Sequence, residues 1–501
     1  MSPYFTQFIQ SKVSTIIKKT ITIKEDSIAL KIIDPYHQDI INQLKNYDIV
    51  ADIKVSDNIM KFFPNQIKLS EIILSSYHSK KPLKSNNVVL IQFEMPSPGL
   101  PLQEIHLRSI YNAQYIKNIK SQTFKVETCC YFWMWGSETG VLLYALEKEL
   151  DQNELNPNTC LTYLEQLYKK YSVEEDIDVK AVEVLSRLHD NDAGLIELWN
   201  LVCQAWKLSY QQIFDQENIQ LCLDFQNDIN NKHLFPKSLI SKLTVSKQCL
   251  WTKVGSLYLN YLSFQKYHHI IKIFNHKNTF HQKEALKLFG DSFKVDLIPL
   301  HDCTGLGEGP ISNWIKNAKI LVAKESNVEL DGINDQVTCK LSISFFITQL
   351  LQMKKTNACV FINGRLKNQE SSVGMYIQYA YARLCGIKRY IQSETNIKFE
   401  DCLNSLNSDF LQPFMSTPKI FQLIHMIEQY PTVITKAEYE PSVLIAFLLK
   451  FSTCISSLYY HLRIKGEDLA VQKARWLVLA TSLDLLENGI LTLGFDPIDE
   501  I

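Results

Sequence analysis

The chain has 501 residues and a mass of 58.0 kDa, which predicts about three domains. Hydrophobic residues make up 46% and charged residues 21%, as in ordinary globular proteins, so a disordered or low-complexity chain is excluded. The net charge of -1 excludes an overall basic field that would draw the protein onto DNA or RNA. Any RNA site must therefore be local, and we expect no DNA partner.

Residues 1–88 are predicted to form a small α+β domain. Residues 1–90 carry 12 lysines and 8 acidic residues, a net charge of +4, so this is the basic part of the chain. A strand-like run at 28–33 precedes a helical pattern at 39–47. Residues 1–24 have no acidic residue and resemble a transit peptide, but the first arginine of the chain is Arg108. We therefore favour a first amphipathic helix of the domain.

Residues 89–368 are predicted to form a Rossmann-like α/β domain. The apolar run at 87–94 is typical of a buried parallel strand, and a Pro/Gly loop and a helical pattern at 105–119 follow it. Longer helical patterns cover 159–171 and 173–214. The glycines at 305–309 indicate a loop rather than a phosphate cradle, because the Gly-Lys-Ser/Thr ending is absent.

Residues 369–501 are predicted to form an all-α bundle. Helical patterns cover 375–390, 417–429, 441–464 and 469–488, and Asn488-Gly489 is expected to end the last helix. The stretch at 441–462 is the most apolar of the chain, but Lys450 and His461 interrupt it. We expect a bundle helix there and no membrane partner.

The twelve cysteines contain no Cys-x-x-Cys pair, which is typical of a reducing compartment, so we expect a cytoplasmic protein. Cys129-Cys130 lies in an apolar context and predicts a buried strand rather than a nucleophile. The histidine cluster could suggest zinc, but it lacks cysteines at ligand spacing. We expect no metal and no cofactor. The cluster consists of His268, His269, His276 and His281.

Three segments resemble arginyl-tRNA synthetase, a class I aminoacyl-tRNA synthetase. Residues 374–383 and 430–495 resemble its DALR anticodon-binding domain, although the motif behind that name reads Asp-Leu-Ala-Val at 468–471. Residues 97–109 look like a shortened class I ATP signature, His-x-Gly-His followed by Leu-Arg-Ser. Residues 135–143 resemble a Trp-Gly segment of the same catalytic domain. The resemblance implies a degenerate class I synthetase domain at 89–368 and a DALR anticodon-binding bundle at 369–501.

The catalytic signature is eroded. Gln103 stands for the first histidine, Ile105 for the glycine on which adenine lies, and only His106 is retained. Residues 300–370 contain no Lys-Met-Ser-Lys-Ser-like loop to neutralise the phosphates; the nearest approach is one lysine beside a glutamate at 324–325. We therefore expect a pseudoenzyme with no catalytic residues.

An intact-looking anticodon-binding domain beside a broken ATP signature resembles the eukaryotic relatives of arginyl-tRNA synthetase that lack the ligase role. The resemblance implies a protein that binds arginine tRNA and presents it to a methyltransferase-like enzyme, the tRNA N3-methylcytidine methyltransferase. That enzyme forms 3-methylcytidine at position 32 of the anticodon loop. Two alternatives remain: a divergent but active arginine-tRNA ligase, and a protein-interaction scaffold that has lost RNA binding.

RNA loops are bound by stacking of bases on aromatic or guanidinium planes and by cations on the phosphates. Residues 371–501 carry a net charge of −3, so a binding face must be a local patch. Lysines of the first domain could contact the outer corner of the tRNA, and a solvated lysine-rich face is the alternative. We expect Tyr379, Tyr459 and Trp476 to lie in the core more readily than to stack on bases. The candidate RNA-binding residues are Arg383, Lys388, Arg389, Tyr390, Tyr460, His461, Arg463, Lys465 and Arg475, with Lys18, Lys19, Lys80, Lys81 and Lys84 in the first domain.

Overall fold

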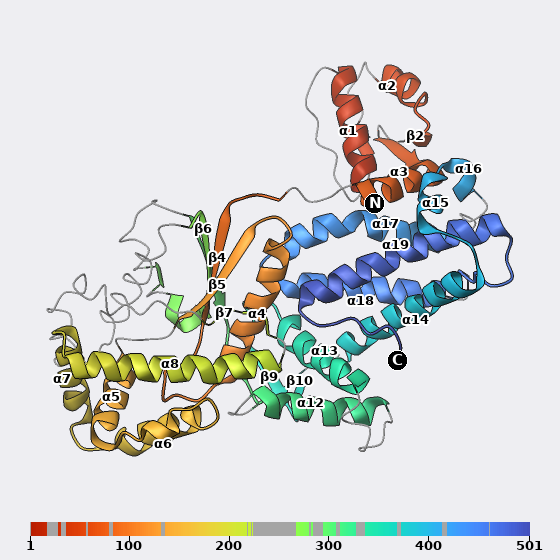
Figure 1. Ribbon diagram of the computed structural model, residues 1–501. Coiled ribbons are helices and arrows are strands. Elements are labelled where there is room, and N and C mark those ends of the chain that lie inside the picture. Colours follow the sequence, from red (N-terminus) through yellow and green to blue (C-terminus); the bar gives the residue numbers. More distant parts are fainter. Residues whose placement is uncertain are drawn as a thin grey trace.

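Figure 1 shows a computed structural model of the chain. The structure describes residues 2–17, 29–31, 37–56, 59–79, 84–131, 136–217, 219–221, 223, 267–279, 282–283, 294–306, 311–326, 336–367, 372–412, 418–459 and 461–501. Several residues named above lie outside these ranges: Lys18, Lys19, Lys80, Lys81, Trp135, His281 and Tyr460.

The N-terminal part is a small α+β unit, as the sequence predicts. Three strands form an antiparallel sheet in the order β1-β3-β2: β1 (Ala29–Lys31), β2 (Val50–Ser56) and β3 (Ile59–Pro64). Three helices accompany them: α1 (Pro3–Ile17), α2 (His37–Leu44) and α3 (Gln66–Ser79). The first helix buries Phe5, Ile9 and Val13 at a spacing of four, so it is an integral helix of the fold.

The middle part contains a parallel sheet, which confirms the predicted α/β fold. Its strand order is β5-β4-β6-β7, and all three pairings are parallel. The strands are β4 (Val88–Glu94), β5 (Lys125–Tyr131), β6 (His269–Asn275) and β7 (Lys294–Leu300). Helix α4 (Glu104–Lys120) joins β4 to β5 and packs on the sheet, and it matches the predicted helix at 105–119. Cys129 and Cys130 lie in buried strand β5, as predicted.

Helices form an arm beyond β5. They are α5 (Ser137–Glu149), the short 3-10 helix η1 (Gln152–Glu154), α6 (Cys160–Tyr171), α7 (Ile177–His189) and α8 (Ala193–Gln216). The pattern at 173–214 thus contains two helices rather than one. Asn191 has a left-handed φ of 72°, and the Asp192 side chain accepts from Leu195 N at 3.2 Å, which caps α8.

A second, three-stranded sheet follows β7. It has the order β10-β9-β8, with β8 (Cys303–Thr304) parallel to β9 (Cys359–Ile362) and β10 (Arg365–Leu366) antiparallel to β9. The short 3-10 helix η3 (His276–Asn278) follows β6 and contacts β7, and helices α12 (Ile311–Ser326) and α13 (Gln336–Gln352) lie between β8 and β9 in the chain. Helix α13 packs against α4, α14 and α18, so it links the parallel sheet to the C-terminal helices.

The C-terminal part is all helical, as predicted. Its helices are α14 (Val373–Glu394), α15 (Phe399–Asn404), α16 (Ser408–Leu411), α17 (Pro418–Ala437), α18 (Pro441–Leu458) and α19 (Leu469–Leu493). Helices α18 and α19 are long and apolar enough to span a membrane, but both are mostly buried among the other helices, as core helices of a folded domain are.

The predicted end of the last helix is wrong. Helix α19 continues past Gly489 to Leu493, and Gly494 ends it with a left-handed φ of 94°. A Cβ at Gly489 would lie 2.7 Å from Leu448 Cδ2, so this glycine permits the close approach of α18 and α19. The glycine therefore serves packing rather than helix termination.

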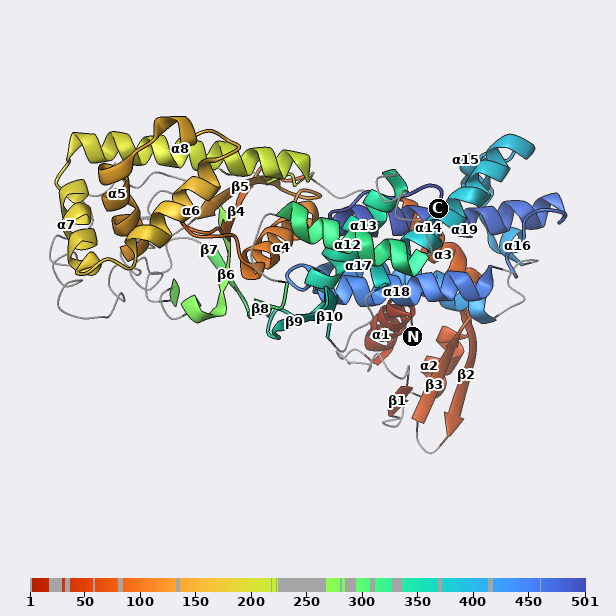
Figure 2. The same ribbon diagram turned by 90° about the horizontal axis from the view of Figure 1, so that it is seen from below.

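The N-terminal unit docks on the C-terminal helices, and the arm of α5–α8 lies at the opposite end of the molecule (Figure 2). Helix α3 packs against α17. The Tyr77 hydroxyl donates to Asp484 Oδ2 at 2.8 Å, and His78 Nε2 lies 2.9 Å from Thr481 Oγ1 on α19. Segments more than 400 positions apart in the sequence are thus joined by direct hydrogen bonds.

Candidate functional site

The eroded ATP signature lies at the N-terminus of α4, directly after the carboxyl end of β4. Gln103 is the exposed N-cap residue, and its backbone N–H donates to His106 Nδ1 at 3.0 Å. Burial lowers the pKa of His106 to about 4, so the imidazole is neutral at pH 7 and can accept this bond. The one retained histidine of the signature is therefore engaged in capping its own helix.

Ile105 takes the position of the signature glycine. Its side chain is half-buried and packs against the hydrophobic core. A branched side chain here covers backbone that a glycine would leave open to an adenine ring.

The carboxyl edge of the parallel sheet carries an acidic residue. Strands β4 and β6 are neighbours whose connections leave in opposite directions, and this is the switch point where α/β sheets bind nucleotides. The Glu94 carboxylate accepts hydrogen bonds from Asn275 N at 2.7 Å and from Asn278 Nδ2 at 3.0 Å. A carboxylate at this edge repels nucleotide phosphates, and its two bonds connect the edge to η3.

The retained Leu-Arg-Ser segment is used by the fold. Arg108 is 1% exposed, and its guanidinium donates to four backbone carbonyls. The Ser109 hydroxyl accepts from Glu94 N at 3.1 Å. The carbonyls belong to His301, Met353, Lys354 and Asn357, at distances of 2.6, 3.3, 2.8 and 2.9 Å.

Two of these carbonyls, those of Met353 and Lys354, directly follow the last residue of α13. The carbonyls at a helix C-terminus lack partners within the helix, and a cation there is favoured by the helix dipole. Arg108 thus ties the signature helix α4 to α13, and the survival of this residue has a structural cause.

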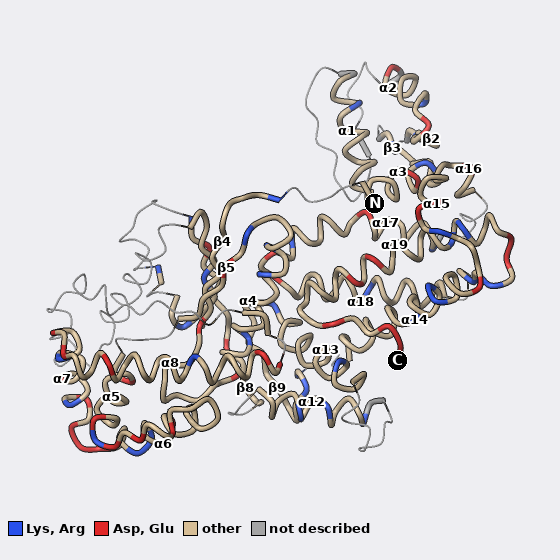
Figure 3. The backbone as a smooth tube through the Cα atoms, viewed as in Figure 1, with Lys and Arg blue, Asp and Glu red and all other residues tan. Residues whose placement is uncertain are grey.

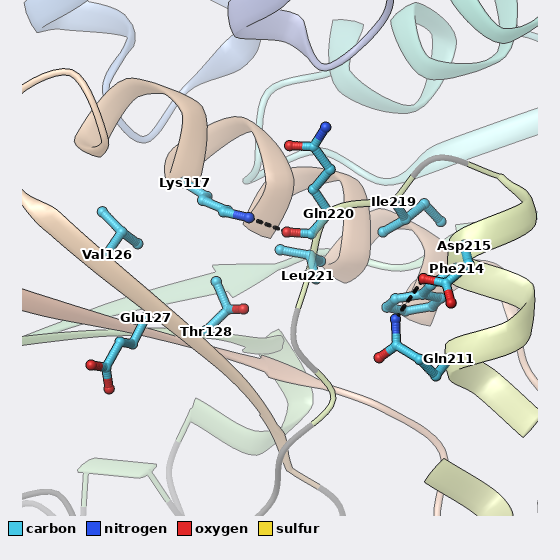
Figure 4. Close-up of a pocket in the computed structure, with 10 residues that line it drawn as sticks. All are labelled: Lys117, Val126, Glu127, Thr128, Gln211, Phe214, Asp215, Ile219, Gln220 and Leu221. Carbon is cyan, nitrogen blue, oxygen red and sulfur yellow. Dashed lines mark hydrogen bonds between the residues drawn. The ribbon is translucent and has the colours of Figure 1, made fainter. Parts of the chain in front are cut away.

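A cavity of about 710 Å³ lies elsewhere on the middle domain (Figure 4). It flanks the amino-terminal half of edge strand β5, where Val126, Glu127 and Thr128 line it, and faces the end of α8. The Lys117 ammonium, at its rim, donates to the Gln220 carbonyl. The signature lies at the carboxyl ends of the parallel strands, so this cavity is separate from the expected nucleotide position.

Aromatic and cationic side chains gather on one exposed face of α14 and on the segment between α18 and α19. We call this set the α14 face: Tyr379, Arg383, Tyr390, Tyr459, His461, Arg463 and Lys465. Lys388 is also exposed, but helical geometry puts it on the opposite side of α14 from Tyr379. The Arg383 guanidinium lies 5.8 Å from the Tyr459 ring centroid, and Lys465 Nζ lies 6.0 Å from that of Tyr390. Figure 3 shows Lys and Arg on this end of α14. The face combines stacking planes with cations, as RNA loops require.

The structure places the two exposed tyrosines differently from the core position favoured above. Tyr379 is 37% exposed and Tyr459 is 40% exposed, whereas Trp476 is 6% exposed and lies in the core as expected. Tyr379 and Arg383 are four residues apart on one helix, so their side chains lie on the same face. Helical spacing alone could not assign that face to solvent.

Two other candidate cations already have partners within the protein. Arg389 Nη1 donates to the Asp499 carbonyl at 2.9 Å. Arg475 is half-buried, lies 3.0 Å from Glu467 Oε1 and donates to the Arg463 carbonyl. In the N-terminal unit, Lys84 is exposed at the start of the connection to β4.

The histidine cluster has structural contacts. His269 Nε2 lies 2.9 Å from Asp296 Oδ2, and the His276 ring stacks on His301 with centroids 4.1 Å apart. Among the described residues no group of three or more His, Cys, Asp or Glu side chains is arranged to hold a metal ion.

Parts of the chain match two known protein families. Residues 377–501 match the DALR anticodon binding domain, and residues 68–238 match the catalytic domain of class I (R) tRNA synthetases. The chain is 21% identical to the probable cytoplasmic arginine–tRNA ligase of Schizosaccharomyces pombe, over 90% of this chain and 84% of that protein. It is 22% identical to the cytoplasmic arginine–tRNA ligase of Saccharomyces cerevisiae, over 91% and 84%.

Solved structures share the fold. Arginyl-tRNA synthetase from Plasmodium falciparum superposes with a TM-score of 0.70 at 15% identity, covering 100% of this chain and 99% of that one. The enzyme from Thermus thermophilus gives the same TM-score at 14% identity, with both chains covered completely. The likeness thus extends over all three parts of the molecule.

Proposed function

We propose that this chain is an arginyl-tRNA synthetase-like protein that binds arginine tRNA without charging it, a proposal supported by the match of residues 377–501 to the DALR anticodon binding domain and of residues 68–238 to the class I (R) catalytic domain. It presents the tRNA to a methyltransferase that forms 3-methylcytidine at position 32 of the anticodon loop. It acts in the cytoplasm, a location supported by its cysteine usage.

The main support for the proposal is that the residues at the N-terminus of α4 are poorly suited to bind ATP. The signature glycine is replaced by Ile105, and the neutral His106 ring accepts from the Gln103 backbone. Glu94 adds a negative charge at the sheet edge. Loss of one donor to the developing charge typically costs about 2.7 to 4 kcal/mol of barrier, so several losses leave little activation of arginine.

The α14 face supports the RNA-binding half of the proposal. It lies within the matched anticodon-binding domain, and it offers Tyr379, Arg383 and Tyr459 to solvent. Exposed rings and guanidinium groups bind unpaired bases with little sequence preference, so the choice of arginine tRNA needs contacts beyond this face.

The test separates charging, binding and methylation. Purified protein is assayed for ATP-dependent charging of arginine tRNA, for a salt-dependent tRNA gel shift, and for stimulation of a purified 3-methylcytidine methyltransferase. We expect no charging, a shift that weakens steeply with salt, and methylation that depends on the protein. A gel shift without any stimulation of methylation would reject the adaptor role and keep only tRNA binding.

The second candidate function is a divergent arginine-tRNA ligase. It is favoured by the relatives, which are named as ligases and align with about nine-tenths of this chain. Turnover of about 1 to 10 per second in the charging assay would establish it and reject the adaptor. The retained Arg108 and Ser109 do not discriminate, since both have contacts that the fold alone explains.

A further inference from the structure

Two cysteines face each other across the small sheet below the signature helix. Strands β8 and β9 are parallel, and their register pairs Cys303 with Cys359. Cys303 is 4% exposed and Cys359 is 0% exposed. Directly paired residues on neighbouring strands lie about 4.8 Å apart, which is within the Cα separation that a disulfide spans. They are distant in sequence, and only the fold brings them together.

A buried guanidinium lies beside the pair. Arg108 donates to the carbonyls of His301 and Asn357, each two residues before one of the cysteines. Hydrogen bonding by Cys303 lowers the pKa of Cys359, and the same bond raises the pKa of Cys303. The charge of Arg108 also favours a thiolate on both sulfurs. The Cys359 thiolate is therefore suited to attack an oxidant first, and the Cys303 sulfur to attack the oxidised Cys359 afterwards.

We propose that Cys303 and Cys359 form a redox-sensitive pair that closes to a disulfide between β8 and β9 when the protein meets hydrogen peroxide. The Cys359 thiolate attacks one peroxide oxygen and the O–O bond breaks, which leaves a sulfenic acid and releases water after protonation. The Cys303 sulfur then attacks the Cys359 sulfur, the S–S bond forms, and a second water leaves with the Cys303 proton. Both thiols lose one electron, and the peroxide gains two.

Access to the pair requires only a small local opening. Strand β8 has two residues, and the next pair in the register, Thr304 and Val360, is exposed. A ladder this short frays at low cost. The disulfide would then fix both strands, and with them the carbonyls that Arg108 binds, so the link between α4 and α13 becomes covalently supported.

The experiment treats the full-length protein with hydrogen peroxide, blocks the remaining thiols by alkylation and measures the intact mass and the linked peptides. We expect loss of two hydrogen atoms per molecule, a Cys303–Cys359 cross-linked peptide, and a Tm raised by roughly 5 °C. Reduction with dithiothreitol should reverse all three changes.

The variants are Cys303→Ser and Cys359→Ser, and the matched control is Cys454→Ser, which alters another buried cysteine on α18. Cys303→Ser should stop at the sulfenic acid, which a dimedone probe traps, while Cys454→Ser should behave as wild type. The proposal is overturned if oxidised wild-type protein retains both thiols in alkylatable form, or if other cysteines form the cross-link. The wild-type measurement alone decides this, whether or not the serine variants fold.

Discussion

Arg108 belongs to the segment that resembles the catalytic signature, and it has a structural role in this fold. Its guanidinium is buried and donates to four carbonyls, two of them at the C-terminus of α13. Removal of the side chain would leave these carbonyls without their donor in a dry site. Gln103 and Ile105, in contrast, are exposed and half-buried, respectively, and the structure gives neither side chain a comparable set of hydrogen bonds.

We predict that Arg108→Ala lowers the free energy of unfolding by about 3 kcal/mol or more, because it orphans buried carbonyls. Arg108→Lys should recover only part of this free energy of unfolding, since a single ammonium group cannot donate to four acceptors as the planar guanidinium does. Urea unfolding followed by circular dichroism measures both. The control Arg187→Ala removes exposed ion pairs with Glu147 and Asp192 and should cost only about 1 kcal/mol. Equal losses for Arg108→Ala and the control would contradict the structural role.

His106 makes stability depend on pH. The folded state holds its pKa at about 4, below the ordinary 6.5, so between these values the unfolded chain binds more protons. The contribution of His106 is complete above pH 6.5 and is lost as the pH falls toward 4. His106→Gln keeps an acceptor for the Gln103 N–H but does not titrate. We expect the wild-type Tm to fall more steeply than that of the variant across this window.

His78 and His269 also have pKa values lowered by burial, so they add to the wild-type slope. Only the difference between wild type and His106→Gln reports on His106. If the two Tm curves are parallel between pH 6.5 and 4, the capping role assigned to the neutral ring is wrong.

Among the elements, α4 and the long helices of the C-terminal part were predictable because their apolar residues repeat at three and four, whereas α5, α12 and α13 were not predicted. Strand β6 was not predicted, since its buried positions include Lys272 and His269, which interrupt the apolar run. Lys272 Nζ lies 4.1 Å from the Tyr131 ring centroid and His269 contacts Asp296. Strand β7 contains Pro299, which a sheet edge tolerates. Only tertiary contacts make such residues compatible with strands.

Part of the candidate site could likewise be predicted from the sequence, and part of it could not. The replacements at Gln103 and Ile105 were visible in the sequence because a motif spacing marks them. The contact of Glu94 with Asn275 joins residues 181 positions apart, and the signal available for it was an acidic residue at the end of a buried run. Likewise, the sequence offered Tyr459 and Arg383 as separate residues, and the packing of α14 beside α18 brings them together.

The close packing of α18 on α19 gives a prediction at the element scale. Gly489→Ala should destabilise the protein by about 1–3 kcal/mol, because the new methyl group meets the buried Leu448 side chain. Gly494→Ala should also destabilise it, but through its left-handed φ, since its Cβ has more room. The loss in the double variant Gly489→Ala/Leu448→Ala should be smaller than the sum of the losses of the two single variants in thermal unfolding, because the new methyl group no longer meets the leucine. Losses that simply add would show that this contact is not the cause.

At the scale of the whole molecule, RNA binding should follow the exposed cations of the α14 face. Arg383→Ala and Lys465→Ala should each weaken tRNA binding and reduce the slope of log K against log salt by about 1. Arg475→Ala should leave the slope unchanged, because this guanidinium is engaged with Glu467. Fluorescence titration at several salt concentrations measures the slopes. A reduced slope for Arg475→Ala alone would move the RNA site to α19.

The N-terminal unit docks on α17 and α19, so direct contacts fix its position relative to the C-terminal helices. Ser2 Oγ donates to Glu428 Oε1 at 2.7 Å and Ser408 Oγ to Glu71 Oε2 at 2.8 Å, in addition to the contacts of Tyr77 and His78. A basic unit and the α14 face are therefore held at a set separation. A folded RNA that contacts both the N-terminal unit and the α14 face gains affinity from bivalent attachment. An isolated stem-loop contacts only one of them and lacks that gain. Under the proposed function, the protein therefore selects its RNA by size before any base is contacted.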